Sequence, residues 1–347
     1  MSFGQFNTSD RGRSGSAVSL RVLVVTAMYP HAGNRGSGAF VMQQVEQLRA
    51  LRHQVDVLHF HGYRSKLQYL RAALEVRKRT RTAKYDVVHA HYGVTGLAAI
   101  FRHATPLVIT LHGSDVLVGT LEPWVSRVAC NRADATIVVS KQIAARIPGV
   151  VIPCGVDLTV FEPKGRQEAR ERLGLPLDKR YVLFPFSPAR MVKRFDVACA
   201  AVNRLSGGGT GIELLTVSKV PNQEMAWYYS AADAMILCSD SEGSPTAVKE
   251  ALACNLPVVA TDVGDVREIL EGIAGAEIRE QSAGALADGL KKILNAPPGF
   301  VFDGRSAMRR YSQESVIQAI IQVYHRAMEN RASKPHNGGV LAVGVGT

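Results

Sequence analysis

Two glutamates, Glu242 and Glu250, flank the start of a predicted helix in the segment SDSEGSPTAVKEALACNLPVVATD, residues 239–262. Ser244 is placed to cap this helix and Pro245 to be its first residue, because serine favours the capping position and proline the first turn. Glu242 then lies in the loop before the helix, and Glu250 lies about a turn and a half into it. One carboxylate can therefore reach a group held above the helix, and the other a group held beside it.

The first turn of this helix offers backbone N–H groups that have no partner inside the helix, those of Thr246, Ala247 and Val248. They lie at the positive end of the helix dipole, which suits a phosphate. With a carboxylate on each side, the arrangement fits a ligand with hydroxyls at both ends and phosphate in the middle, the layout of a nucleotide-sugar. The alternative is an ordinary surface helix that carries an exposed glutamate.

The elements around this helix favour the binding interpretation. ADAMIL before it and LPVVAT after it are typical of buried strands, and Asn255 is a plausible stop for the helix. Open α/β sheets bind ligands at the carboxyl ends of their strands, where this loop would lie.

A basic loop follows another predicted strand, RYVLFPF, and carries Arg190, Lys193 and Arg194. Arginine and lysine at such a place can neutralise a departing diphosphate. The alternative is that all three side chains are solvated.

Histidines end two further predicted strands. His112 follows PLVITL in the segment LHGSDV, where it would face the crevice and hydrogen bond to a substrate hydroxyl, or else cap the next turn. His89 and His91 end the strand DVVHAH. Their spacing could chelate a metal, but no third ligand is apparent, so an acceptor-side or structural role is favoured.

A loop with Gly36 and Gly38 connects the first predicted strand, RVLVVT, to a helix. Glycines there would let the backbone approach a ligand closely, although any such loop can carry glycine. The pattern does not match the dinucleotide fingerprint G-x-G-x-x-G, which argues against a nicotinamide-dependent dehydrogenase.

Strand and helix patterns alternate twice along the 347 residues, which predicts an α/β protein of two doubly wound Rossmann-like domains with parallel sheets. We expect a disordered leader over 1–17, an N-terminal acceptor-side domain over 18–156, a C-terminal nucleotide-sugar-binding domain over 157–312, a helix over 313–330 that begins after Ser312, and a tail over 331–347.

Composition limits the partners. The formal net charge is +11, with 46% hydrophobic and 20% charged residues, typical of a globular protein. No zinc-finger or aromatic RNA-binding signature accompanies the charge, so no nucleic-acid partner is expected. Five scattered cysteines predict neither a disulfide framework nor a zinc site. No signal peptide or membrane span is evident, so we expect a cytoplasmic protein.

Residues 64–84 contain eight basic residues against the single acid Glu75, with Leu67, Leu70 and Leu74 at helical spacing. Such a basic amphipathic helix can lie on an anionic membrane surface, which would make the protein peripheral on the inner face of the membrane. The alternative is a solvated face over an ordinary core stripe.

The motifs together resemble family 4 glycosyltransferases of the GT-B fold over nearly the whole chain, from Arg21 to about Glu329. The resemblance rests on EGSPTAVKEALACNLPVVATDVGDVREI, VIPCGVDLTVFEP, ARMVKRFD, LHGSDV and GSGAF. Within the family, HGSDV, VKRFD and SEGSPTAVKEALACNLPVV are most similar to teichuronic-acid-type and related cell-surface polysaccharide enzymes.

The resemblance implies two Rossmann-like domains facing a cleft, with the C-terminal helix crossing back to the first domain. It implies a retaining transfer of the hexosyltransferase type from a nucleoside diphosphate sugar to a lipid-linked or polysaccharide acceptor, with no cofactor and no metal. By position, the donor sugar would be held by Glu242, Gly243 and Ser244, and approached by His112. Glu250 would hold the ribose.

For the diphosphate, the resemblance implies contacts from Arg190 and Lys193, with backbone approach at Gly38. The helix start that includes Pro245, Thr246 and Ala247 is expected beside them because of its free N–H groups. No carboxylate stands out as a covalent nucleophile, so a same-face mechanism is expected, in which the leaving-group oxygen helps to deprotonate the acceptor.

Three departures from the family pattern are visible. Cys154 stands where asparagine is common, the loop after Val217 reads SKVP instead of G-x-G-P, and Arg194 stands where glycine is frequent. The SKVP loop leaves the base open. A sugar-nucleotide epimerase of the same fold and a non-catalytic nucleotide-sugar-binding subunit remain alternatives, although a silent subunit would not need the full set of site residues.

Overall fold

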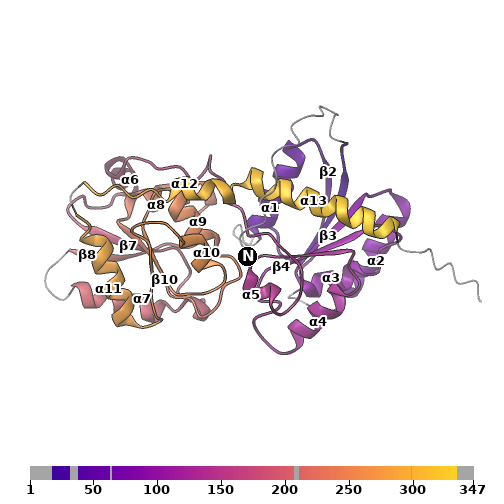
Figure 1. Ribbon diagram of the computed structural model, residues 1–347, viewed down its shortest axis with the longest axis horizontal. Helices are drawn as coiled ribbons and strands as arrows, with labels where there is room; N and C mark the ends of the chain where they lie inside the picture. The colour runs from indigo at the N-terminus through magenta and orange to yellow at the C-terminus, as the bar shows by residue number, and fades with distance from the viewer. Residues whose placement is uncertain (1–17, 32–37, 63–64, 207–210, 298, 334–347) are drawn as a thin grey trace, which may run out of the picture.

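The computed structural model describes residues 18–31, 38–62, 65–206, 211–297 and 299–333. Two α/β lobes lie side by side, each with its own parallel sheet (Figure 1). The predictions for 1–17, for Gly36 and for most of the tail fall outside the described residues. Among the described residues, no helix is long and apolar enough to cross a membrane.

The first lobe has a six-stranded parallel sheet in the order β2-β1-β3-β4-β5-β6. Every residue of its central strands β3 and β4 is buried, as in parallel sheets covered by helices on both faces. The strands are β1 Arg21–Thr26, β2 Gln54–His59, β3 Val87–His91, β4 Leu107–Leu111, β5 Ala135–Val138 and β6 Val150–Val151. The helices are α1 Ala39–Ala50, α2 Leu67–Thr82, α3 Gly93–Ala99, α4 Leu121–Cys130 and α5 Lys141–Ala144.

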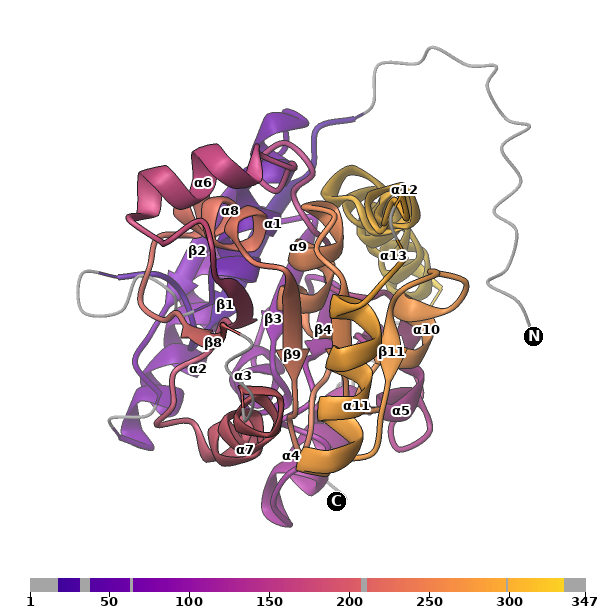
Figure 2. The same ribbon diagram turned by 90° about the vertical axis from the view of Figure 1, so that its left-hand side faces the viewer.

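The second lobe has a five-stranded parallel sheet in the order β11-β10-β9-β7-β8. Viewed from its outer end, α6, α8 and α9 lie above this sheet and α7 and α11 below it (Figure 2). The strands are β7 Arg180–Phe184, β8 Ile212–Thr216, β9 Ala234–Leu237, β10 Val258–Ala260 and β11 Glu277–Ile278. The helices are α6 Arg166–Leu173, η1 Met191–Lys193, α7 Phe195–Ser206, α8 Asn222–Ala231, α9 Thr246–Ala253, α10 Val266–Leu270, α11 Ala283–Leu294, α12 Arg305–Met308 and η2 Arg309–Tyr311.

The chain passes between the lobes twice, and the two passages pair with each other. Val156 and Ser312 form a parallel bridge, which brings the first passage beside the start of α13, Gln313–Ala332. The Ser312 hydroxyl accepts from the Ser315 N–H at 3.2 Å, so the predicted cap is confirmed. Helix α13 then packs Ile320 and Tyr324 against the first lobe, so the predicted crossing back is also confirmed (Figure 1).

Helix α2 rules out the core-stripe alternative for its leucines. Its buried residues are Ala72, Ala73, Val76 and Thr80, and this face lies toward α3. The leucines are instead 65%, 59% and 62% exposed at 67, 70 and 74, so they are not a core stripe. Small residues let α2 approach α3 closely, which leaves the larger leucines outside.

Candidate functional site

The two lobes meet backbone to backbone where the loop after β4 touches the loop after β9. A Cβ on Gly243 would lie 2.0 Å from the carbonyl oxygen of His112, and one on Gly113 would lie 2.9 Å from the Cα of Gly243. Gly113 also has φ +115°, which side chains rarely adopt. Two predicted site loops from different lobes are therefore held in direct contact, and only glycine fits between them.

Glu242 and Lys193 form a nearly buried ion pair beside this contact. Their side chains are 13% and 5% exposed, and the Ser239 hydroxyl donates to the same carboxylate oxygen at 2.7 Å. The Lys193 ammonium also lies 4.1 Å from the ring centroid of Phe186. Burial lowers the pKa of Lys193, while the charge of Glu242 opposes that shift. The lysine expected to meet a diphosphate is thus paired with the glutamate expected to meet the sugar.

The other two basic residues of this loop differ from each other. Arg190 is exposed, and its guanidinium makes no hydrogen bond or ion pair with any described residue. Arg194 is bound to Asp196 at 2.8 Å and to Asp240 at 3.2 Å. Arg194 also has φ 52°, the left-handed region that favours glycine. Arg190 is therefore available to an anionic ligand, whereas Arg194 is already neutralised.

The start of α9 differs from the expectation by one residue. The helix begins at Thr246, and Pro245 occupies the capping position with no side-chain cap. Ser244 does not cap it, because its hydroxyl donates to Asp265 at 2.7 Å and accepts from the backbone N–H of Cys154 at 3.1 Å. The first-turn N–H groups of α9 have no partner inside the helix, and their binding of an anion stays a prediction.

A buried cluster explains the position of Ser244. Lys249 is fully buried, contacts the Ser244 hydroxyl, and lies 3.2 Å from a carboxylate oxygen of Asp265. Burial raises the pKa of Asp265 and raises the pKa of the Cys154 thiol to about 11. Because Cys154 belongs to the passage between the lobes, the cluster ties the loop of Glu242 to that passage.

Glu250 is oriented by Tyr229, whose hydroxyl donates to it at 2.8 Å from the neighbouring helix α8. Burial raises the pKa of Glu250, and this hydrogen bond opposes the shift. Sequence reasoning missed Tyr229, because it lies on a helix whose pattern showed only packing. The Thr246 side chain also hydrogen bonds to Glu250, and a carboxylate with these two donors can still accept from ligand hydroxyls.

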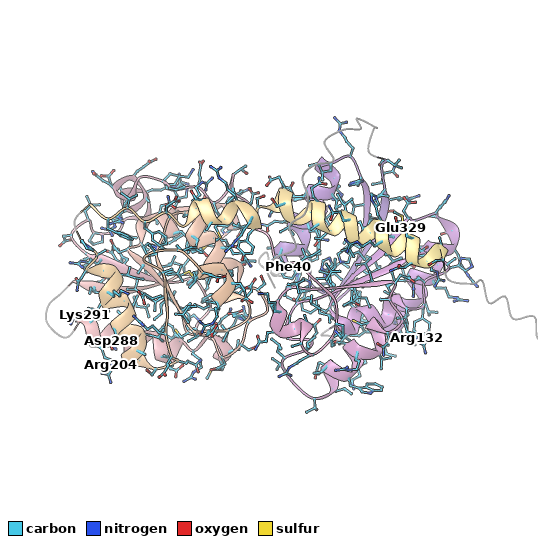
Figure 3. All side chains as sticks on the ribbon, in the orientation of Figure 1. Phe40, Arg132, Arg204, Asp288, Lys291 and Glu329 are labelled. Atoms are coloured by element: carbon cyan, nitrogen blue, oxygen red, sulfur yellow. The ribbon has the colours of Figure 1, made fainter. Side chains whose placement is uncertain are left out.

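His112 lies among aromatic rings at the lobe junction, with Phe40 and Tyr92 each 4.7 Å away between ring centroids. Figure 3 places Phe40 at this junction. The backbone N–H of His112 donates to buried Asp115 at 3.0 Å, which fixes the loop. Tyr92, which sequence reasoning also missed, has φ 73°, and such strain clusters at functional sites.

His89 and His91 have no metal-like surroundings. His89 lies 2.7 Å from the hydroxyls of both Tyr324 and Thr110, and His91 lies 3.0 Å from His112. Among the described residues, no group of three or more side chains is arranged to hold a metal ion. The structural alternative accounts for His89, which connects the sheet to α13.

Gly38 makes its close approach to the chain's own backbone. It has φ 65°, and a Cβ there would lie 2.2 Å from the carbonyl oxygen of Met28. The need for glycine is therefore explained by the turn that enters α1. Its predicted approach to a ligand stays a prediction.

Comparisons with known proteins agree with this architecture. Residues 34–160 match the family described as Glycosyltransferase Family 4, and residues 189–296 match Glycosyl transferases group 1. TuaC of Bacillus subtilis strain 168, a glycosyltransferase named for teichuronic acid biosynthesis, is 29% identical over 79% of this chain and 89% of its own. D-inositol 3-phosphate glycosyltransferase of Mycobacterium tuberculosis is 30% identical over 74% of this chain and 65% of its own.

Solved structures share the fold at low identity. Sucrose-phosphate synthase of Thermosynechococcus elongatus superposes with a TM-score of 0.76 at 19% identity, covering 89% of this chain and 99% of that one. HepE of Anabaena, solved with UDP-glucose, superposes with a TM-score of 0.66 at 17% identity, covering 88% and 99%.

Proposed function

The chain belongs to the family 4 glycosyltransferases of the GT-B fold, and from that premise we propose that it transfers a sugar from a nucleoside diphosphate sugar to a cell-surface glycan acceptor with retention of configuration. The observation that carries the proposal is the contact between the His112–Gly113 and Glu242–Gly243 loops. This contact places the loop that precedes α9 beside His112, whose ring lies against Phe40 and Tyr92.

Each part of the donor has a matching group. Glu250, oriented by Tyr229, accepts from the ribose hydroxyls. The N–H groups at the start of α9 and the guanidinium of Arg190 bind the diphosphate, since the N–H groups have no partner inside the helix and the guanidinium pairs with no described residue. Glu242 and the backbone of Gly243 bind the donor sugar. UDP and UDP-glucose, which HepE binds, are the first ligands to try.

A same-face mechanism fits the charges. The bond from the anomeric carbon to the diphosphate breaks while the acceptor oxygen bonds to the same face of that carbon. The acceptor proton passes to the leaving phosphate oxygen, so atoms and charge balance without a protein nucleophile. Glu242 is held by Lys193, which makes it a poor nucleophile and a good ligand for sugar hydroxyls.

Transfer is tested with purified protein, UDP-glucose and related nucleotide-sugars, and a lipid-linked acceptor. We expect nucleoside diphosphate release that depends on acceptor, with the label moving to the acceptor. Glu250→Gln and His112→Gln should lower the rate at least about 10-fold, and the exposed control Glu271→Gln should not. A changed sugar that stays on the nucleotide would establish the epimerase alternative, and binding without turnover the silent subunit.

The acceptor is lipid-linked, in our proposal, and the outer face of α2 holds the protein against an anionic membrane. The exposed leucines at 67, 70 and 74 share this face with Arg71, Lys78 and Arg81. Apolar side chains ringed by cations match a lipid surface, where the chains enter the boundary region and the cations meet head groups.

Vesicle co-sedimentation tests this surface. Phosphatidylglycerol vesicles should bind the protein and phosphatidylcholine vesicles should not. Replacing the three cations by glutamine should weaken binding about 100-fold, at roughly 1 kcal/mol for each charge. Replacing the leucines by serine should weaken it as well. The control changes Arg204 and Lys291 to glutamine at the far end of the second lobe (Figure 3). Equal losses in control and α2 variants would contradict the proposal.

A further inference from the structure

A buried histidine lies directly behind His112. His91 at the end of β3 has no exposed surface, and its Nδ1 lies 3.0 Å from the Nε2 of His112. Its other nitrogen, Nε2, is buried without a hydrogen-bond partner among the described residues. One ring nitrogen of His91 thus contacts His112, and the other has no hydrogen-bond partner among the described residues.

Burial keeps both rings neutral. It lowers the pKa of His91 to about 3, and it lowers the pKa of His112 well below the ordinary value. A neutral imidazole carries one proton, on either Nδ1 or Nε2. Between the two facing nitrogens, one must donate and the other accept.

The unpartnered nitrogen decides which one donates. If His112 donated, His91 would carry its proton on Nε2, as a buried N–H with nothing to bind. Orphaned buried N–H groups are rarer than under-satisfied acceptors, because burying a donor without a partner costs its full desolvation. His91 therefore carries its proton on Nδ1 and donates it to His112.

We infer that His91 is a positioning residue that fixes His112 in the tautomer with the proton on Nδ1. His112 then presents Nδ1–H as a donor, and this atom makes no hydrogen bond with any described residue. The group that it recognises is a hydroxyl oxygen of the sugar. The inference rests on the proposed function for the identity of the ligand, but not for the tautomer.

His89 holds His91 in place from behind. Their ring centroids lie 4.4 Å apart, and His89 is fixed between Tyr324 on α13 and Thr110 on β4. The ring of His91 is therefore confined between His89 and His112, so it cannot turn its Nδ1 away.

Nitrogen-15 NMR of the histidine side chains tests the tautomer without any turnover. Two-bond couplings distinguish Nδ1–H from Nε2–H, and spectra of His112→Gln and His91→Asn assign the two rings. We expect Nδ1–H in both His91 and His112 at pH 7.5. A proton on Nε2 of His112 would overturn the inference, whether or not the protein transfers sugar.

Kinetics tests the consequence with matched variants at one position. In His91→Asn the amide nitrogen takes the place of Nδ1 and can still donate, whereas His91→Leu fills the space without a donor. Leucine should lower kcat about 10-fold to 100-fold with the donor KM little changed, and asparagine should restore kcat to within about threefold.

Folding and ligand binding serve as controls for these variants. Both should bind UDP with the affinity of the unchanged protein, which shows that the second lobe is intact. Equal kcat losses in the asparagine and leucine variants would show that the ring merely fills space. Absence of transfer by the unchanged protein, with the expected NMR tautomers, would instead refute the proposed function alone.

Discussion

Arg190 and Arg194 lie in one loop and have opposite electrostatic surroundings. Arg194 is neutralised by two aspartates, whereas Arg190 has no partner among the described residues. We predict that Arg190→Ala weakens UDP binding about 10-fold or more, because a charge-assisted hydrogen bond to phosphate is lost. Arg194→Ala should stay within about threefold. Titration calorimetry measures both, and a larger loss for Arg194 would reverse the assignment.

For single residues, the sequence predicted which side chains lie near the site better than it predicted which side chains pair with each other. Glu242, Lys193 and His112 all lie at the lobe junction or beside it, as their places after strands indicated. Yet Lys193 and Glu242 come from two different loops, and they pair because a buried charge without a partner would destabilise the fold. Neither loop's local pattern carries this information.

The end of α9 relies on a left-handed residue that is not glycine. Asn255 has φ 55°, the next N–H, of Leu256, bonds back to the Ala251 carbonyl at 2.8 Å, and the Asn255 side chain accepts from the Arg305 N–H at 2.9 Å. We predict that Asn255→Ala lowers the free energy of unfolding by about 1–3 kcal/mol, from the backbone conformation and the lost bond.

Asn255→Gly separates these two causes. Glycine adopts the left-handed conformation freely and loses only the hydrogen bond, so its cost should be about 1 kcal/mol or less. Urea unfolding measures both variants. If glycine proved as damaging as alanine, backbone conformation would not be the reason for asparagine here.

Elements were predicted where their pattern was unambiguous. The stop at Asn255, the cap at Ser312 and the strand β1 follow from local chemistry. The start of α9 was not predicted correctly, because the Ser244 hydroxyl hydrogen bonds to Asp265 instead of capping the helix. Asp265 is distant in sequence, so only the tertiary structure brings it to Ser244. Which face of α2 is buried could not be predicted either, since both faces carry apolar residues and the position of α3 decides between them.

Stability of the whole molecule should fall in acid because of its buried histidines. Burial lowers the pKa of His89, His91 and His112, so the unfolded chain binds more protons than the folded one below about pH 6.5. Stability is then lost as pH falls, by about 1.4 kcal/mol per pH unit for each histidine. Burial raises the pKa of Asp115 and Asp265, which works in the opposite direction nearer pH 4.

The variant His91→Asn isolates one of these histidines. Between pH 6 and 5 its unfolding free energy should change less steeply than that of the unchanged protein, by about 1.4 kcal/mol per pH unit. Urea unfolding at each pH gives the two slopes. Identical slopes would mean that His91 titrates normally in the folded protein.

The contact between the lobes should depend on glycine at position 243, where a side chain would not fit. In Gly243→Ala the new Cβ would meet the His112 carbonyl at 2.0 Å, and backbone cannot yield as a flexible side chain does. We predict that the lobes move apart, that kcat falls about 100-fold or more because reacting groups are displaced, and that UDP binding is retained.

The control is Gly284→Ala in α11, where the new Cβ meets nothing within 4 Å, so the lobe separation, kcat and UDP binding should all stay unchanged. Small-angle scattering measures the separation. A normal kcat in Gly243→Ala would show that the closed contact is not the reactive arrangement, since chemistry would then proceed with the loops apart.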